Sequence, residues 1–274
     1  MARLTVLGAR GFVGSRLVRE LERRGQPFDA PETADRAALE RLLADSPDLG
    51  DVVYCIGLTA DYAKRPFDTV EAHTSLLARI LQRGNFRRLV YLSSTRLYDT
   101  LPPGHYAEDQ AFRLSPANPR DVYDLSKCLG EWLCLNTAPD RTMVARLACV
   151  YDSEEGATGF LPDLLRRLPN ERDIHLDSAT GFVRDYIHSS DVVEALIRMA
   201  GEGTGIVNLG SGRNVSNGEM AAWLNGLGWS VTLARETPLQ AAASVDVTRL
   251  TQEVGVRPVQ LEAFLKEFAK RIPR

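Results

Sequence analysis

Tyr123 and Lys127 stand four residues apart in the segment "DVYDLSKCLGEW", residues 121–132. The segment has a helical pattern, so both side chains are expected on one helical face and in contact. A free phenol has a pKa of about 10 and is a poor acid–base group at neutral pH, but a neighbouring ammonium stabilises the phenolate and lowers that pKa. The pair is therefore suited to move a proton to or from a carbonyl or alcohol oxygen. The plain alternative is a surface contact between two side chains.

Hydroxyl groups follow a second segment, "LVYLSSTRLY", in which Ser93, Ser94 and Thr95 come at the end of an apolar run. In parallel sheets, ligands bind beyond the carboxyl ends of the strands. A hydroxyl at this position can hydrogen-bond the oxygen on which Tyr123 acts. The alternative is that these hydroxyls only cap the following turn.

Three glycines, Gly8, Gly11 and Gly14, are spaced three apart in "VLGARGFVG", between the first apolar run and the first helical pattern. Glycine permits a tight turn and a close approach of phosphate to the backbone, and the N-terminus of the following helix favours a pyrophosphate. At a strand-to-helix junction the spacing favours a dinucleotide site over a purely structural turn.

The choice between NAD and NADP stays open at this point. Asp29 lies about where an acid accepts the ribose hydroxyls of NAD, although it is equally suited to a turn or cap. Arg10, inside the glycine loop, is suited to a 2′-phosphate and favours NADP. Simple solvent exposure of Arg10 is the alternative.

Continuously apolar runs of strand length alternate with helical periodicity through most of the chain, which predicts a doubly wound α/β fold with a parallel sheet. Between Gly25 and Asp51 there is room only for a short strand in "PFDAP" and a helix in "DRAALERLLA", so the second and third strands are expected to be abbreviated or merged. After residue 150 the alternation weakens. We predict a dinucleotide-binding domain of residues 1–150, to which 186–212 return, and a smaller substrate lobe of 151–185 and 213–274.

Composition excludes several classes of protein. The chain of 274 residues is 44% hydrophobic and 25% charged, with a formal net charge of −3, so it lacks the basic field of a nucleic-acid binder. We find neither a signal-peptide pattern nor an apolar run of the ~18 residues that span a membrane. The four cysteines are scattered and are expected to be reduced in a cytoplasmic protein. No metal-ligand spacing appears, and we expect no metal.

Together these segments resemble the extended short-chain dehydrogenases/reductases that act on nucleotide sugars, along nearly the whole chain. "GARGFVG" is similar to the family's GxxGxxG loop, "YLSSTRLY" to its catalytic strand and "NPRDVYDLSKCLGE" to its active-site helix. The resemblance implies Ser94, Tyr123 as acid/base and Lys127 as the catalytic set. "GFVRDYIHSSDVVEAL" resembles the segment whose arginine, here Arg184, holds the substrate diphosphate.

The resemblance also implies the binding residues and the assembly. For the cofactor these are Gly8, Arg10, Gly11, Phe12, Val13, Gly14, Asp29, Cys55, Ile56, Gly57, Tyr123, Lys127 and Leu147. Thr95, Cys149 and Arg184 are the implied substrate-binding residues. The implied assembly is a homodimer through the helices at about 70–84 and 122–137.

Four departures from the family pattern stand out. Cys149 replaces an asparagine that commonly contacts substrate, Asp152 replaces a glycine, and His73 stands where asparagine is usual. The loop between Ser94 and Tyr98 lacks the Asp-Glu pair of the 4,6-dehydratases, which argues against a dehydratase.

The resemblance implies an NAD- or NADP-dependent enzyme that reduces a 4-keto group, or epimerises C4, of a nucleotide-activated sugar. The clipped segment before residue 51 is more like dTDP-4-dehydrorhamnose reductase than UDP-galactose 4-epimerase and favours the ketoreductase. A catalytically silent dinucleotide sensor and a reductase of a non-sugar carbonyl are the alternatives. The intact Ser94, Tyr123 and Lys127 set argues against the sensor.

Overall fold

The apolar runs form one six-stranded sheet in the computed structural model of the chain, which describes residues 3–33, 36–45, 47–59, 61–154, 157 and 159–272. All neighbouring strands in this sheet are parallel. Their order is β10 (Gly205–Leu209), β6 (Thr142–Leu147), β4 (Arg88–Ser94), β3 (Asp51–Tyr54), β1 (Leu4–Leu7) and β2 (Phe28–Asp29). The prediction of a doubly wound parallel sheet is confirmed.

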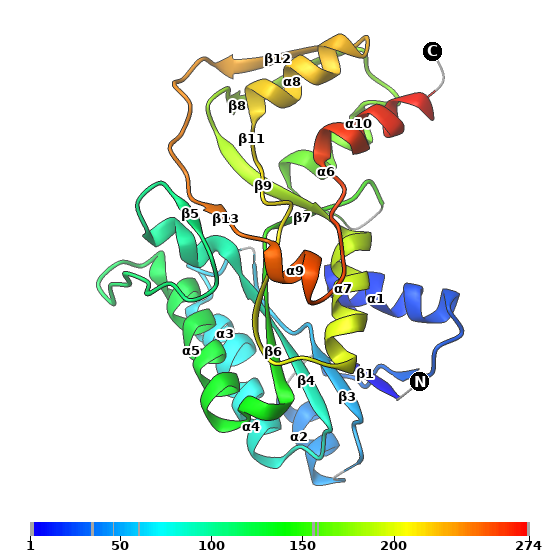
Figure 1. The fold of residues 1–274 in the computed structure, drawn as a ribbon, viewed down its shortest axis with the longest axis vertical. Coiled ribbons are helices and arrows are strands. Elements are labelled where there is room, and N and C mark those ends of the chain that lie inside the picture. The colour runs from blue at the N-terminus through cyan, green and yellow to red at the C-terminus, as the bar shows by residue number, and fades with distance from the viewer. Residues whose placement is uncertain are drawn as a thin grey trace.

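Helices cover both faces of this sheet (Figure 1). Leu17, Leu21 and Leu196 pack beneath one face, and Leu39, Ile80 and Cys134 beneath the other. The first face carries α1 (Phe12–Arg23) and α7 (Ser189–Gly201), and the second carries α2 (Arg36–Ala44), α4 (Leu76–Arg83) and α5 (Asp121–Thr137). Because helices bury both faces, the strands need apolar residues on both sides, and β1 and β3 are buried throughout.

The segment between α1 and β3 is short, as predicted. It contains the two-residue strand β2 and the helix α2; the first residue of the expected helix, Asp35, lies outside the described residues. The strand β2 forms one edge of the central sheet. The loop after this short strand lies beside the glycine loop, since the Gly8 N–H donates to Thr33 Oγ1 at 3.1 Å.

The expected helix over 70–84 is not continuous. It consists of α3 (Pro66–Val70), a π-helical turn (Glu71–Ser75) and α4. π-Helical turns are rare and frequently occur at functional sites. This one carries the fully buried His73.

A second group of elements lies above the carboxyl edge of the sheet (Figure 1). The expected strand over 142–151 divides at Ala148, whose N–H donates to Leu209 O, so β6 stays in the central sheet while β7 leaves it. The second sheet has the order β11 (Asn214–Ser216), β9 (Val183–His188) and β7 (Cys149–Tyr151). Further pairs are β8 (Asp173–Ala179) with β12 (Ser230–Arg235), and β5 (His105–Tyr106) with β13 (Ser244–Val245).

Three helices build a separate apolar core with these strands. They are α6 (Phe160–Arg167), α8 (Asn217–Gly226) and α10 (Leu261–Lys270), and their core includes Leu164, Leu224 and Leu265. A capping box begins α8: Ser216 Oγ accepts from the Glu219 N–H, and the Glu219 carboxylate accepts from the Ser216 N–H. A short helix, α9 (Thr248–Gln252), leads back to the central sheet beside β10.

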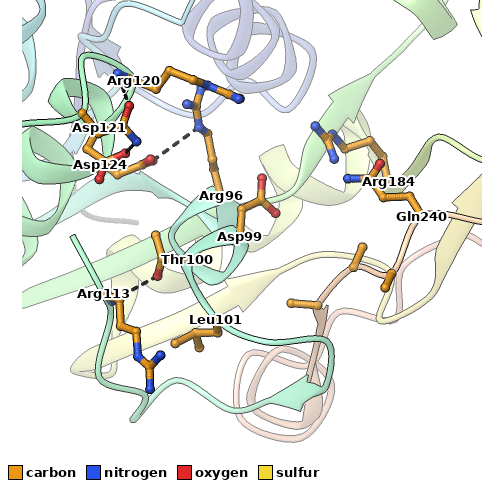
Figure 2. Close-up of a pocket in the computed structure, with 14 residues that line it drawn as sticks. Arg96, Asp99, Thr100, Leu101, Arg113, Arg120, Asp121, Asp124, Arg184 and Gln240 are labelled. Atoms are coloured by element: carbon orange, nitrogen blue, oxygen red, sulfur yellow. Dashed lines mark hydrogen bonds and ion pairs between the residues drawn. The ribbon is translucent and has the colours of Figure 1, made fainter. Parts of the chain in front are cut away.

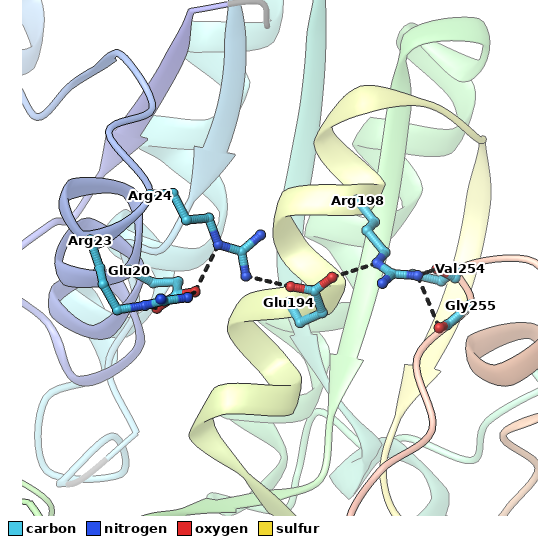
Figure 3. Close-up of polar contacts among 7 residues, drawn as sticks. All are labelled: Glu20, Arg23, Arg24, Glu194, Arg198, Val254 and Gly255. Atoms are coloured by element: carbon cyan, nitrogen blue, oxygen red, sulfur yellow. Dashed lines mark hydrogen bonds and ion pairs between the residues drawn. The ribbon is translucent and has the colours of Figure 1, made fainter.

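Arginines of α1 and α7 and of their ends pair with acids on these helices. Arg24, directly after α1, donates to Glu20 and to Glu194 of α7, and Glu194 also accepts from Arg198 (Figure 3). Such exposed ion pairs are typically worth about 0–1 kcal/mol each, so they orient α1 beside α7 more than they stabilise the chain. No helix in the described ranges is long and apolar enough to cross a membrane.

Candidate active site

The glycine loop joins β1 to α1 in a turn that the larger residues cannot form. Gly8 has φ +83°, and a Cβ there would lie 2.8 Å from Cys55 C and Ile56 N. A Cβ on Gly14 would lie 2.3 Å from Gly8 O. The loop thus packs directly on the end of β3, and its backbone borders a cleft at the N-terminus of α1.

This cleft has a volume of about 450 Å³. Its lining is Gly8, Ala9, Arg10, Gly11, Ala30, Pro31, Glu32, Thr33, Cys55, Ile56 and Gly57. A backbone cradle that a Cβ would fill, at a helix N-terminus, fits the pyrophosphate of a dinucleotide. Six of the predicted cofactor residues line the cleft: Gly8, Arg10, Gly11, Cys55, Ile56 and Gly57.

Other predicted cofactor residues lie around the cleft without lining it. The Phe12 ring lies under the Arg16 guanidinium at 4.3 Å, and Val13 packs against the main core. Leu147 ends β6 directly opposite Ser94 of β4. Gly14 acts through its close packing on Gly8.

Asp29 lies outside the lining of the cleft. Its carboxylate pairs with Arg3 rather than lining the cleft. Because β2 has only two residues, the chain turns back into the cleft just after it, and the acid found there is Glu32. Glu32 Oε1 accepts from Arg10 Nη2 at 2.7 Å. Arg10 and Glu32 therefore line the cleft as an ion pair, and Asp29 does not line it.

Ser94 and Tyr123 meet at the carboxyl edge of the sheet. Ser94 is the last residue of β4, and Tyr123 lies buried in the first turn of α5. Burial raises the pKa of Tyr123, while a hydrogen bond with the Ser94 side chain and the charge of Arg96 act to lower it. Because the net shift of the Tyr123 pKa is upward, the phenol is protonated at neutral pH.

The Lys127 side chain contacts the backbone of β4. Its Nζ donates to Leu92 O at 2.7 Å and lies 5.9 Å from the centroid of the Tyr123 ring. Burial lowers the pKa of Lys127 to about 7. The pKa of Tyr123 is raised, and Lys127 is not among the main groups that lower it. Lys127 instead faces Gly57 at the edge of the dinucleotide cleft, where a Cβ on Gly57 would lie 3.7 Å from Nζ.

His73 joins three segments around this set. Its Nε2 accepts from the Leu58 N–H at 3.1 Å, and its Nδ1 lies 2.8 Å from Ser126 Oγ. Burial and the charge of Lys127 lower the pKa of His73 to about 2. The imidazole is therefore neutral with its proton on Nδ1, and it ties the loop after β3 to α5.

A second pocket, of about 390 Å³, is lined in part by Arg96, whose guanidinium faces the Tyr123 ring. Arg96 and Asp99 come from the turn after β4, and Arg184 and Gln240 lie opposite them (Figure 2). Its lining also includes Thr100, Leu101, Arg113, Asn118, Arg120, Asp121, Asp124, Ala241, Ala242 and Ala243. Of the predicted substrate residues, the structure brings Arg184 into this pocket.

Thr95 and Cys149 do not line this pocket. Thr95 Oγ1 donates to Leu147 O at 3.3 Å, and Cys149 starts β7 as an exposed residue paired with Tyr186. Arg96 and Asp99 line this pocket and Glu32 lines the dinucleotide cleft, and none of the three was predicted from the sequence. The one available signal was a charged residue two positions after Ser94, at a strand end where the fold places its chemistry.

A model described as "NAD dependent epimerase/dehydratase family" matches residues 4–210. A dTDP-4-dehydro-6-deoxy-D-allose reductase of Streptomyces bikiniensis is 27% identical over 307 residues, covering 97% of this chain and 94% of that protein. MoeE5 in complex with UDP-glucose and NAD has the same fold, with a TM-score of 0.76 and 22% identity over 98% of this chain and 99% of that chain. RMD from Pseudomonas aeruginosa complexed with NADPH also has a TM-score of 0.76, with 22% identity over 99% and 100%.

Proposed function

This chain belongs to the NAD dependent epimerase/dehydratase family, and from that premise we propose that it is a 4-ketoreductase of a nucleotide-activated sugar. The observation that carries the proposal is that Lys127 borders Gly57 of the dinucleotide cleft, while Arg96 of the arginine-lined pocket contacts both Ser94 and Tyr123. A bound nicotinamide dinucleotide would supply the hydride to the sugar carbon. Similarity to the dTDP-4-dehydro-6-deoxy-D-allose reductase of Streptomyces bikiniensis supports reduction of the sugar as the direction of the reaction.

The dinucleotide is held, in this proposal, by the glycine loop and the segments around it. Gly8, Gly11 and the N-terminus of α1 would bind the pyrophosphate, and Cys55 to Gly57 would line the site after β3. Arg10 and Glu32 would face the adenosine ribose. Lys127 would lie at the nicotinamide end, since it borders Gly57.

Tyr123 is the proposed proton donor to the oxygen of the 4-keto group. The phenol is protonated at neutral pH because burial raises its pKa, which suits a group that gives a proton away. Ser94, in contact with the phenol, would hydrogen-bond the same substrate oxygen. Proton donation by a positioned side chain typically contributes about 10²–10⁴-fold to the rate.

The nucleotide diphosphate is the proposed ligand of Arg184. Its guanidinium lines the pocket without a carboxylate partner among the described residues, and the same holds for Arg113 and Arg120. An arginine guanidinium binds a phosphate through two parallel hydrogen bonds to two of its oxygens. Because Arg184 and Gln240 come from residues 151–185 and 213–274, we propose that these two segments form the substrate lobe.

The assembly that we propose is a homodimer through α5 and the interrupted helix of α3, the π-helical turn and α4, which packs against α5. Phe67 of α3 and Trp132 and Leu129 of α5 are exposed by 88%, 55% and 48%. Large exposed apolar side chains grouped on neighbouring helices mark interaction surfaces.

The test is incubation of the purified protein with 4-keto UDP-, dTDP-, CDP- and GDP-sugars and the corresponding 4-hydroxy sugars, with and without NADH or NADPH. Stoichiometric oxidation of the reduced dinucleotide with formation of a 4-hydroxy sugar is the expected result. Conversion of a 4-hydroxy sugar without added dinucleotide would instead identify a 4-epimerase, and release of water a dehydratase. Turnover of non-sugar ketones alone, or of nothing, would contradict the proposal.

A further inference from the structure

The cation that faces the Tyr123 ring most closely is Arg96. Its guanidinium carbon lies 5.2 Å from the ring centroid, whereas Lys127 Nζ lies at 5.9 Å and donates to Leu92 O. Burial lowers the pKa of Lys127 to about 7, so this lysine carries only part of a charge near neutrality. An arginine keeps its charge at every pH at which the protein is folded.

Contacts on three sides hold Arg96 in this position. The Tyr62 ring centroid lies 4.6 Å from the guanidinium, and Arg96 Nε lies 3.5 Å from Asp124 Oδ1 (Figure 2). The backbone N–H of Arg96 donates to Ser94 Oγ at 3.1 Å. One residue therefore contacts both members of the hydroxyl–phenol pair, its backbone at Ser94 and its side chain at Tyr123.

We propose that Arg96 is a positioning residue that holds the Ser94–Tyr123 pair and stabilises the phenolate formed when Tyr123 gives its proton to the substrate oxygen. In that step the phenol O–H bond breaks, the proton forms a new O–H bond on the substrate, and the negative charge left on Tyr123 lies beneath the guanidinium. Water later returns a proton to the phenolate. The inference rests on the proposed function for the identity of Tyr123 as proton donor.

The other groups around Tyr123 do not replace Arg96. Asp124, on the same helix, opposes phenolate formation, as does the Tyr62 ring from the segment before α3. His73, on the π-helical turn, meets the ring edge at 5.1 Å between centroids and is neutral. Lys127 is engaged with β4. Arg96 is thus the one group among these that combines a permanent positive charge with a place over the ring.

The test reads the ionisation of residue 123 alone, in the protein without substrate or dinucleotide. Tyr123 is replaced by a difluorotyrosine, which shifts the phenol titration into the range where the protein is folded, and the fluorine resonance is followed against pH. Arg96→Met is expected to raise the titration midpoint by about one pH unit or more, since an opposite charge within ~4–6 Å shifts a pKa by 1–3 units. Arg96→Lys is expected to raise it less, because a charge remains while the planar contact is lost.

Two controls separate this effect from general loss of charge or of structure. Arg113→Met removes an arginine from the same pocket but away from the Tyr123 ring, and we expect the midpoint to stay unchanged. Since Arg96→Met leaves Asp124 without its ion pair, the comparison is repeated in an Asp124→Asn background, where the Arg96-dependent rise must persist.

An unchanged midpoint in Arg96→Met, in folded protein and in both backgrounds, would overturn the inference. So would an equal rise in Arg113→Met, because it would reduce the effect to the charge of the pocket. The titration needs no turnover, so it can fail while the sugar panel succeeds, and the panel can fail while the titration succeeds.

Discussion

Arg16 and Asp152 join the glycine-loop helix to the second sheet through a two-pronged ion pair. Arg16 Nε lies 2.9 Å from Oδ2 and Nη2 lies 3.2 Å from Oδ1, with side chains exposed by 9% and 3%. Asp152 directly follows β7 and stands where the resembling family has glycine. The departure noted in the sequence thus provides a buried connection between the dinucleotide cleft and the second sheet.

Asp152→Asn is expected to lower the free energy of unfolding at pH 7 by about 3 kcal/mol, because breaking a buried pair leaves an uncompensated charge. Burial opposes ionisation of Asp152, but hydrogen bonds from Arg16 and Ser189 outweigh it, so the pKa lies below its ordinary value. A depressed pKa gives stability that is complete above about pH 4 and is lost as the pH falls through the folded-state value. Urea unfolding at pH 7 and pH 3 should therefore show a smaller acid loss in the variant than in the native protein.

The matched control for this pair is Asp177→Asn, in an exposed pair with Arg235. It should change the free energy of unfolding by less than about 1 kcal/mol. Equal effects of the two variants would contradict a special role of the buried pair.

His73→Gln tests the buried neutral histidine. The pKa of His73 is lowered to about 2 by burial and by Lys127, whereas an unfolded histidine titrates near pH 6.5. The unfolded chain then binds the proton first, so the native protein is expected to lose about 1.4 kcal/mol per pH unit from this group as the pH falls below about 6. The variant should lose this part of the slope in unfolding experiments between pH 7 and pH 5.

His105→Gln, at an exposed position, is the control for the exchange of histidine for glutamine. His73→Gln should also be less stable at pH 7, because the Leu58 N–H and Ser126 Oγ lose a partner, at a cost of about 1–3 kcal/mol. A variant as stable as the native protein, with the same pH slope, would show that the imidazole is not buried as described.

Tyr123→Phe is expected to reduce kcat by about 10²–10⁴-fold, the usual contribution of a positioned acid. Dinucleotide binding should be retained, because the phenol lies outside the lining of the cleft. Calorimetric titration with NADH and NADPH measures the binding, and the Tyr106→Phe variant is the control for loss of a tyrosine hydroxyl, here one that donates to Pro102 O. If turnover survives in Tyr123→Phe, another group must carry the proton.

Local patterns were sufficient to predict the central sheet, since β1, β3 and β4 are apolar runs and α1 has apolar residues on one face. The pair β8 and β12 was not predicted as a pair because both strands are half-exposed and lack a continuous apolar run. The π-helical turn was also missed. A periodicity near 3.6 does not reveal one inserted residue per turn when both flanking helices keep their apolar faces.

At the site, residue type and spacing indicated the glycine loop, the Tyr123–Lys127 pair and a hydroxyl at the end of β4. The choice of Ser94 for that hydroxyl came from the family resemblance. The predicted effect of Lys127 on the Tyr123 phenol stays a prediction, with Nζ at 5.9 Å from the ring centroid. A spacing of four places two side chains on one face of a helix, but it does not determine where a four-carbon chain ends, and Nζ turns to Leu92 O. Arg96 reaches Tyr123 from another element, so no spacing within the sequence relates them.

The proposed dimer is tested with Trp132→Glu. Burying a carboxylate in an apolar contact is costly, and an interface tryptophan often contributes about 2 kcal/mol or more to the free energy of binding. The dissociation constant of the dimer should therefore rise by at least about 30-fold. Sedimentation velocity over a range of protein concentrations measures it. Leu239→Glu is the control, because Leu239 is exposed by 70% and belongs to neither α3 nor α5. A monomeric native protein, or an unaltered dimer in Trp132→Glu, would place the interface elsewhere.

We expect the ion pair of Arg10 with Glu32 to govern the choice between NADH and NADPH. A carboxylate at the ribose favours the free hydroxyls of NADH, and an arginine favours the 2′-phosphate of NADPH. Glu32→Gln removes the repulsion of that phosphate and releases Arg10 from its 2.7 Å contact, so the ratio of the NADPH to the NADH dissociation constant should fall by about tenfold, or 1.4 kcal/mol. Arg10→Gln should raise the same ratio. The Asp29→Asn control should leave it unchanged, because Asp29 pairs with Arg3 outside the cleft; a shift in that variant instead would restore Asp29 as the ribose ligand.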